Sequence, residues 1–280
     1  MPPGPPPGRH PGLPTEVLAP AADRRGRRLV LVHGFTQTGR SWWPVATALA
    51  DAGHEVAMVD APGHGAASGV RADLPQGAQL LAAAGGRATY VGYSMGARLC
   101  LHLALARPDL TEALVLIGAT AGIADPTERA ARRRADEDLA ATLDRPPVDE
   151  ASPEARRRLD AFLADWLARP LFATLDPAAA GLDDRRRNSC AGLAASLRLA
   201  GTGTQAPLWD PLAGLPVPTL VLAGALDTKF AALGRALAAA IGPAAQLALV
   251  EGAGHAAHLE RPASVVALVA RFLEACDRAA

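Results

Sequence analysis

The fold of this chain is decided by the stretch Val91–Arg98, which reads VGYSMGAR. A short β-branched and aromatic run precedes the serine and helical spacing follows it, so the stretch predicts a strand, a sharp turn and a helix. Gly92 and Gly96 flank Ser94, where a strained turn needs small residues because strand and helix pack closely around it. We therefore predict a nucleophile elbow, in which the backbone N–H of Met95 points to the place where negative charge develops.

Further strands are predicted on both sides of this turn. The continuous apolar run at 29–32 is typical of a buried parallel strand, and 54–60 and 112–117 are also strand-like. Strand character returns at 217–222 and 246–250. Helices are expected at about 42–52, 73–84, 230–241 and 262–275. This alternation indicates an α/β fold, with a mostly parallel sheet and helices on both faces.

The segment 121–207 interrupts the alternation. It contains no good strand, and its helical stretches are rich in arginine and glutamate and broken by prolines. Active sites of open α/β sheets lie beyond the carboxyl ends of the strands, so a helical insertion leaving such an end would cap Ser94. The predicted parts are a disordered Pro/Gly-rich leader with a short N-terminal segment (1–26), a core (27–120 and 208–280) and a cap (121–207).

Composition and charge narrow the class of protein. The chain has 280 residues, half of them hydrophobic, which is enough for a sizeable core. Its 28 basic and 28 acidic residues balance, so nothing in the overall charge favours nucleic acid or an anionic membrane. No apolar run reaches the roughly 18 residues of a transmembrane helix. Three widely spaced cysteines indicate a reducing compartment. We expect a cytoplasmic protein without membrane segments, either monomeric or homo-oligomeric.

Two loops beyond the elbow offer partners for the serine. A serine hydroxyl reacts only if an imidazole takes its proton and a carboxylate holds that imidazole. Asp227 and His255 each follow a predicted strand, in the order that a serine elbow requires. Asp227 is alternatively the N-cap of the next helix, and His258 competes with His255. We favour His255 because it follows a Gly-x-Gly loop, whereas His258 is expected to open the last helix.

Other loop residues are given supporting roles. His33 and His64 lie in His-Gly-Phe and Pro-Gly-His-Gly loops and are predicted to order them. Phe35 would offer a second backbone N–H to an oxyanion. No His/Cys/Asp cluster has metal-ligand spacing, and no Gly-rich phosphate loop follows a strand. We therefore predict neither a metal nor a cofactor.

Several arginines bear on the kind of substrate. Arg98 lies four residues after the serine and shares its helix face, where a guanidinium suits a carboxylate near the reacting centre. The alternative for Arg98 is a surface position or a salt bridge under the cap. Arg132–Arg134 and Arg185–Arg187 belong to the cap, and most of them are expected on solvated helix faces. Trp166 and Phe172 would form either an apolar wall or the packing of the cap.

Together, these motifs resemble a known family. His33–Phe35, Pro62–Gly65 and Gly92–Gly96 resemble the α/β-hydrolase superfamily in general. More specific motifs lie in the elbow and the cap: Tyr93, Arg98, Glu128–Arg132, Asp165–Trp166, Pro170–Phe172 and Leu193–Gln205. With them, residues 27–277 look like a 2-succinyl-6-hydroxy-2,4-cyclohexadiene-1-carboxylate synthase, a family of lyases in menaquinone biosynthesis.

The resemblance implies the α/β-hydrolase fold and the elimination of pyruvate from 2-succinyl-5-enolpyruvyl-6-hydroxy-3-cyclohexene-1-carboxylate. It implies that Ser94, Asp227 and His255 form a triad that removes a ring proton, and that the N–H groups of Phe35 and Met95 hold the oxyanion. The implied substrate-binding residues are Arg98, Arg132, Arg185, Arg187, Tyr93 and Trp166. Several arginines around a serine suit a small polycarboxylate, whereas a lipid ester would want an apolar pocket.

Some features depart from the family. Ala97 stands where a second glycine is expected, and the match at Arg185–Arg187 is ambiguous by a residue or two. A carboxylic-ester or thioester hydrolase would use the same triad through a covalent intermediate, and it is the alternative function. A non-catalytic binding protein of the same fold is a third reading, which the complete triad argues against.

Overall fold

The computed structural model describes residues 12–20, 26–144 and 149–279. Its seven strands form one sheet in the order β1-β3-β2-β4-β5-β6-β7. The strands are β1 (Thr15–Leu18), β2 (Arg28–Val32), β3 (Glu55–Val59), β4 (Ala88–Tyr93), β5 (Thr111–Ile117), β6 (Thr219–Gly224) and β7 (Ala245–Val250). All neighbouring pairs are parallel except β1 and β3, so the predicted α/β class is confirmed.

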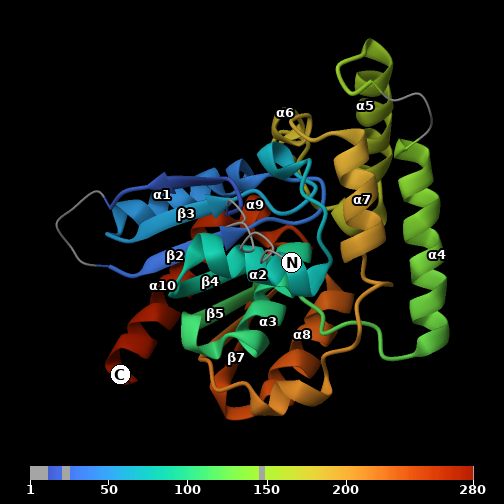
Figure 1. Ribbon diagram of the computed structural model, residues 1–280. Helices are drawn as coiled ribbons and strands as arrows, with labels where there is room; N and C mark the ends of the chain where they lie inside the picture. Colours follow the sequence, from blue (N-terminus) through green and yellow to red (C-terminus); the bar gives the residue numbers. More distant parts are fainter. Residues whose placement is uncertain (1–11, 21–25, 145–148, 280) are drawn as a thin grey trace, which may run out of the picture.

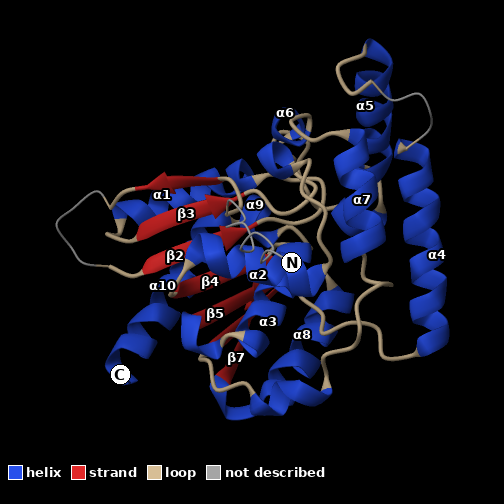
Figure 2. Ribbon diagram, in the orientation of Figure 1, coloured by secondary structure: helices blue, strands red, loops and turns tan. Residues whose placement is uncertain are grey.

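Helices cover both faces of the sheet (Figures 1 and 2). The helices of this layer are α1 (Trp43–Asp51), α2 (Leu74–Gly85), α3 (Met95–Ala106), α8 (Thr228–Ile241), α9 (Ala257–Glu260) and α10 (Pro262–Ala279). Helices α1 and α10 pack on one face, and α2, α3 and α8 on the other. The sheet thus separates two hydrophobic cores: the first lies under α1 and α10, and the second lies under α2, α3 and α8. Along β2, Leu29 and Leu31 belong to the first core and Val30 and Val32 to the second, as the two-residue period of a strand requires. None of the described helices is long and apolar enough to cross a membrane.

Among the described residues, four α-helices lie between β5 and β6: α4 (Pro126–Leu143), α5 (Pro153–Leu167), α6 (Leu182–Arg185) and α7 (Cys190–Ala200). The described residues of this segment contain no strand. The parallel strands point towards these helices, which stand beyond the carboxyl end of the sheet (Figure 2). We call α4–α7 the cap. The predicted boundaries of leader, core and cap remain a prediction.

Strand β1 was not expected from the sequence. The first residues were predicted to be disordered with almost nothing to bury; residues 1–11 lie outside the described part, but Leu13 is 5% exposed and belongs to the second core. Thr15–Leu18 pairs with β3 as an antiparallel edge strand whose side chains alternate between exposed and half-buried. A four-residue strand covered on one face leaves too short a pattern to be distinguished from a loop.

Candidate active site

The elbow places Ser94 at the carboxyl end of β4, where α3 begins. Ser94 has φ of +50° and is one of two non-glycine residues with positive φ in the described part. A Cβ on Gly96 would come 2.1 Å from the carbonyl oxygen of Val32, and one on Gly92 2.5 Å from the backbone of Ala97. Both glycines are therefore needed for the close approach of helix and strand, as the sequence predicted.

Three side chains from separate loops meet at the elbow. Nε2 of His255 lies 3.3 Å from Oγ of Ser94, and Nδ1 lies 2.9 Å from Oδ2 of Asp227. The other oxygen of Asp227 accepts the backbone N–H of Phe230 at 3.0 Å, so Asp227 is the N-cap of α8 as well as the partner of His255. Asp227 is therefore both the partner of the histidine and a helix N-cap, because each role uses a different carboxylate oxygen.

The environment of Asp227 keeps its carboxyl ionised. Burial alone raises its pKa, but the hydrogen bonds from His255 and from the N–H of Phe230, with the charge of Lys229, outweigh burial and leave the pKa below its ordinary value. An ionised Asp227 accepts the Nδ1–H of His255 and so directs the lone pair of Nε2 towards Ser94. The arrangement suits proton transfer from the serine to the histidine.

His258 is not part of this constellation. It lies in α9 and does not open the last helix, because α10 begins four residues later. Its ring is fully buried, and the ring centre lies 4.2 Å from that of Tyr93 and 4.5 Å from that of Trp42. Its Nε2 lies 3.3 Å from Nε2 of Gln37. Burial, with the nearby charge of Arg185, lowers the pKa of His258 well below its usual value, so the ring is neutral.

The loop after β2 holds Phe35 over the elbow. Nε2 of His33 accepts the N–H of Ala61 at 3.0 Å, and Nε2 of His64 accepts the N–H of Thr36 at 3.3 Å. Both histidines therefore order loops. Thr36 has φ of +69°, a strained backbone conformation for a residue other than glycine. Hydrogen bonds to its N–H and to its carbonyl oxygen hold it in that conformation.

Cap residues supply the remaining contacts of that loop. Nδ2 of Asn188 donates to the carbonyl oxygen of Thr36 at 2.7 Å. Arg185 donates from Nη1 to the hydroxyl of Thr36 and from Nε to the carbonyl oxygen of Ala180. The loop that carries the proposed oxyanion donor Phe35 is thus tied to the cap.

A cavity of about 450 Å³ opens over Ser94 between core and cap. Ser94, Met95, His255 and Phe35 line its inner part. Four cationic side chains also line it: Arg98, Arg132, Arg169 and Lys229. No aspartate or glutamate is among the described residues that line it. The cavity therefore suits an anion.

Arg98 is the most buried of these cations. It is 7% exposed, and Nη1 donates to the carbonyl oxygen of Ala200 at 2.8 Å and to Oε1 of Gln205 at 3.3 Å. Within the described part of the chain Arg98 forms no ion pair. Burial, followed by repulsion from Arg132, lowers its pKa to about 10, so it stays charged near neutral pH. The alternatives of a surface position or a salt bridge do not hold.

The three other predicted arginines lie in different places. Arg132 is half-exposed in the cavity wall and pairs with Asp136 at 2.8 Å. Arg185 is 1% exposed and faces a separate hollow of about 30 Å³ beside Ser94. Arg187 is exposed and lines another depression, with Glu16, so the geometry gives no support to its prediction as a substrate-binding residue.

Tyr93 and Trp166, which the resemblance implies to bind the substrate, line hollows next to Ser94. Tyr93 is buried, lines the small hollow and packs its ring 5.3 Å from that of His255. Trp166 lines both the hollow and the larger cavity, and it also belongs to the hydrophobic core, as does Phe172. Trp166 therefore forms part of the cavity wall and also packs in the hydrophobic core. Its buried Nε1 has no hydrogen-bond partner among the described residues.

Sequence reasoning missed two of the cavity's cations. Arg169 follows α5 and holds its guanidinium carbon 4.5 Å from the ring centre of Trp166. Lys229 is exposed and lies two residues after Asp227. Lys229 is the only lysine in the chain, and this could have marked it in the sequence as a residue of interest. Nothing in the sequence distinguished Arg169 from the other arginines of the cap.

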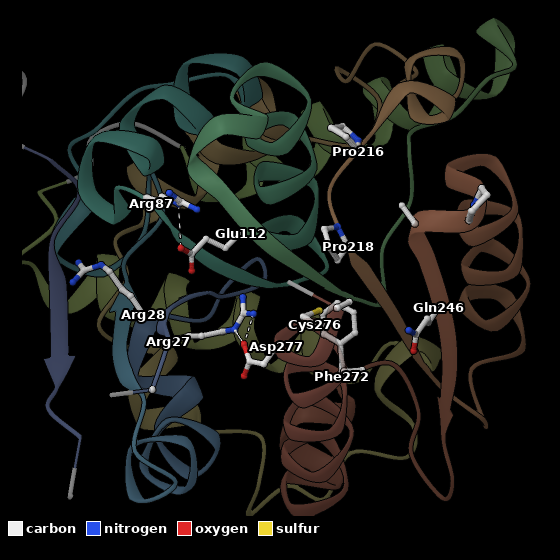
Figure 3. A pocket seen from close by; sticks show the side chains of 15 residues that line it. Arg27, Arg28, Arg87, Glu112, Pro216, Pro218, Gln246, Phe272, Cys276 and Asp277 are labelled. Carbon is white, nitrogen blue, oxygen red and sulfur yellow. Dashed lines mark hydrogen bonds and ion pairs between the residues drawn. The ribbon is translucent and has the colours of Figure 1, made fainter. Parts of the chain in front are cut away.

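A larger hollow, of about 890 Å³, lies at the amino ends of the strands (Figure 3). Its arginines have carboxylate partners: Arg87 pairs with Glu112 at 3.1 Å and Arg27 with Asp277, as the dashed lines in Figure 3 mark. The cations at the Ser94 cavity differ, because only Arg132 among them has such a partner in the described part of the chain.

Known proteins match almost the whole chain. The sequence profile of the alpha/beta hydrolase family matches residues 29–268. The 2-succinyl-6-hydroxy-2,4-cyclohexadiene-1-carboxylate synthase of Klebsiella pneumoniae (strain 342) is 31% identical, over 88% of this chain and 93% of that protein. The enzyme of the same name from Escherichia coli O1:K1 is 32% identical with the same coverage. The solved structure of MenH from S. aureus matches with a TM-score of 0.83 and 26% identity, over 94% of this chain and 98% of that one.

Proposed function

The chain belongs to the alpha/beta hydrolase family, and within it to the 2-succinyl-6-hydroxy-2,4-cyclohexadiene-1-carboxylate synthases, and we propose that it catalyses the reaction named by these relatives. The reaction eliminates pyruvate from 2-succinyl-5-enolpyruvyl-6-hydroxy-3-cyclohexene-1-carboxylate, in menaquinone biosynthesis and in the cytoplasm. The substrate is small and carries three carboxylates, on the ring, the succinyl group and the enolpyruvyl group.

One observation carries the proposal: a buried guanidinium without a carboxylate partner lies one helical turn from the serine of a triad. Burying a charge is costly unless an opposite charge compensates it, and within the described residues no carboxylate pairs with Arg98; the attraction of Asp136 is outweighed by burial and by the repulsion of Arg132. A substrate carboxylate would supply that compensation. An apolar ester would leave the charge uncompensated, so the geometry favours an anionic substrate.

The chemistry begins with removal of the ring proton on carbon 2, next to the succinyl carbonyl. His255 takes the proton of the Ser94 hydroxyl, and the serine oxygen takes the ring proton. The electron pair of the broken C–H bond moves onto the carbonyl oxygen, where the N–H groups of Phe35 and Met95 stabilise the oxyanion. Asp227 stabilises the imidazolium that forms.

The second step expels the leaving group. As the carbonyl re-forms, electrons shift to place ring double bonds at carbons 2 and 4, and the bond from carbon 5 to the enolpyruvyl oxygen breaks. The departing enolpyruvate takes the proton from His255 at its methylene carbon and becomes pyruvate. Ser94 keeps the ring proton, so the triad returns to its starting state without an acyl-enzyme.

Residues of both the core and the cap orient this substrate. Arg98 and Arg132 would bind carboxylates from the cavity wall. The ring of Trp166 would pack against the substrate from the cavity wall. Tyr93 and Arg185 act from the smaller hollow, where Arg185 holds the loop of the proposed oxyanion donor.

The test is pyruvate release from the enolpyruvyl substrate, followed by coupling to lactate dehydrogenase. The wild-type chain should release pyruvate, and Ser94→Ala should slow the release roughly 10³-fold or more, because the base is lost. Arg187→Ala is the matched control, since it removes an exposed arginine outside the cavity.

The same preparation separates the lyase from a hydrolase. A p-nitrophenyl ester of succinate offers the triad an acyl group and one carboxylate, and its turnover is measured in parallel. Rapid ester turnover without pyruvate would replace the proposed function by the ester or thioester hydrolase.

A further inference from the structure

Arg169 is a cation of the Ser94 cavity that Asp136 and Asp165 attract only from beyond ion-pair distance. No carboxylate of the described residues lies in ion-pair contact with it. Burial, and then repulsion from Arg132, lowers the pKa of Arg169. An arginine that is partly buried beside a like charge is costly unless an anion joins it.

A stack of rings fixes the position of Arg169. Its guanidinium carbon lies 4.5 Å from the ring centre of Trp166, and that ring packs edge-on against Phe35, with centres 4.9 Å apart. The ring of Phe162 is nearly parallel to that of Trp166, with the ring centres 6.2 Å apart. The guanidinium therefore lies on a platform of packed rings, Trp166, Phe162 and Phe35, the last of which belongs to the loop of the proposed oxyanion hole.

The succinyl group of the substrate matches this platform. In the proposed reaction its carbonyl oxygen is the oxyanion held by the N–H of Phe35, and two methylene groups separate that carbonyl from the terminal carboxylate. The methylene groups would pack on the rings of Phe35 and Trp166, both of which line the cavity. The carboxylate would then reach Arg169.

The positions of the other three cations of the cavity agree with this assignment. Arg98 and Arg132 approach from α3 and α4, and Lys229 lies on α8 beside Phe230, so Arg169 is the one that stacks on Trp166. We propose that Arg169 binds the terminal carboxylate of the substrate's succinyl group. The assignment rests on the proposed function and makes Arg169 a specificity residue for a dicarboxylic acyl chain.

The test uses product inhibition, because the two products differ in the group concerned. The diene product keeps the succinyl carboxylate, whereas pyruvate never carries it. Arg169→Ala should raise KM and the inhibition constant of the diene product by about 10-fold, as loss of one charge-assisted hydrogen bond predicts. The inhibition constant of pyruvate should stay unchanged, and kcat should change much less than KM because the contact persists through the reaction.

Two variants control for charge and folding. Arg169→Lys keeps the charge and should restore part of the affinity, and Arg187→Ala should match the wild type in every constant. Thermal unfolding of Arg169→Ala checks that the cap stays folded. The proposal would be overturned if Arg169→Ala raised only the inhibition constant of pyruvate, or if it changed neither that constant nor the inhibition constant of the diene product.

Failure of the proposed function looks different. A wild-type chain that releases no pyruvate would refute the lyase, whatever Arg169 does. Calorimetric titration with succinate reports on the subsite without turnover. Succinate should bind the wild type at least about 10-fold more tightly than Arg169→Ala, and equal binding would count against the subsite.

Discussion

Replacing Arg98 by alanine should reduce kcat/KM for pyruvate release more than it reduces the stability of the fold. The guanidinium is buried and held by the carbonyl oxygen of Ala200 and by Gln205. Those two bonds use Nη1, and an arginine has five N–H donors, so others are free to bind a substrate carboxylate.

The magnitude follows from that geometry. Truncating one partner of a buried, hydrogen-bonded charge pair costs about 2–5 kcal/mol, much of it from the charge left unpaired. The carboxylate of a free substrate is solvated before it binds, so we expect the lower part of that range, about 2–4 kcal/mol. This corresponds to a loss of roughly 30- to 1,000-fold in kcat/KM.

Gln205→Glu is the matched variant for this prediction. The side chain is 4% exposed and its Oε1 already accepts from Arg98, while its Nε2 has no hydrogen-bond partner among the described residues. A glutamate of the same shape would pair with Arg98 permanently and compete with the substrate. Gln205→Glu should therefore raise KM although every arginine is present.

The assay is initial-rate pyruvate release over a range of substrate concentrations, with unfolding in urea measured on the same samples. An unchanged kcat/KM in Arg98→Ala would show that Arg98 only ties α3 to the cap. A normal KM in Gln205→Glu would refute the reasoning from the other side, because an internal carboxylate would then not compete with the substrate.

Other predictions concern the triad, the elbow and acid stability. Asp227→Asn should lower kcat roughly 10³-fold or more, because the amide no longer selects the required tautomer of His255, and single-turnover pyruvate release measures the loss. Gly96→Ala should cost about 3 kcal/mol or more of unfolding free energy in urea, since its Cβ would meet a β2 carbonyl oxygen at 2.1 Å. Burial, then repulsion from His33, lowers the pKa of His64 from 6.5 to about 3, so the stability it contributes is complete above pH 6.5 and is lost as pH falls towards 3. His64→Gln should flatten the decline in unfolding free energy across that window, and an unchanged slope would contradict this account.

The sequence was informative wherever local pattern and chain order determine position. Strands β2 to β6 were predicted to within about two residues because their apolar runs are buried on both faces. Ser94, Asp227 and His255 were found together because each follows a strand, and the carboxyl ends of parallel strands meet at one edge of the sheet.

The arginines of the cap could not be assigned in the same way. Arg185 and Arg187 are two residues apart, yet one is buried beside the serine and the other is exposed at a different depression. Which of them turns inwards depends on how the short helix α6 packs, and the sequence does not give that packing. Arg169 acquires its place only through the face of Trp166, a tertiary contact without a pattern of its own.

Thr36 has a consequence for engineering. Asn188 and Arg185 reach it from the cap, and His64 reaches it from the core. Transplanting a foreign cap onto this scaffold would remove two of these three anchors at once, so a chimaera would inherit the serine but lose the support of its oxyanion loop. A working graft has to carry this pair of anchors along as part of the module.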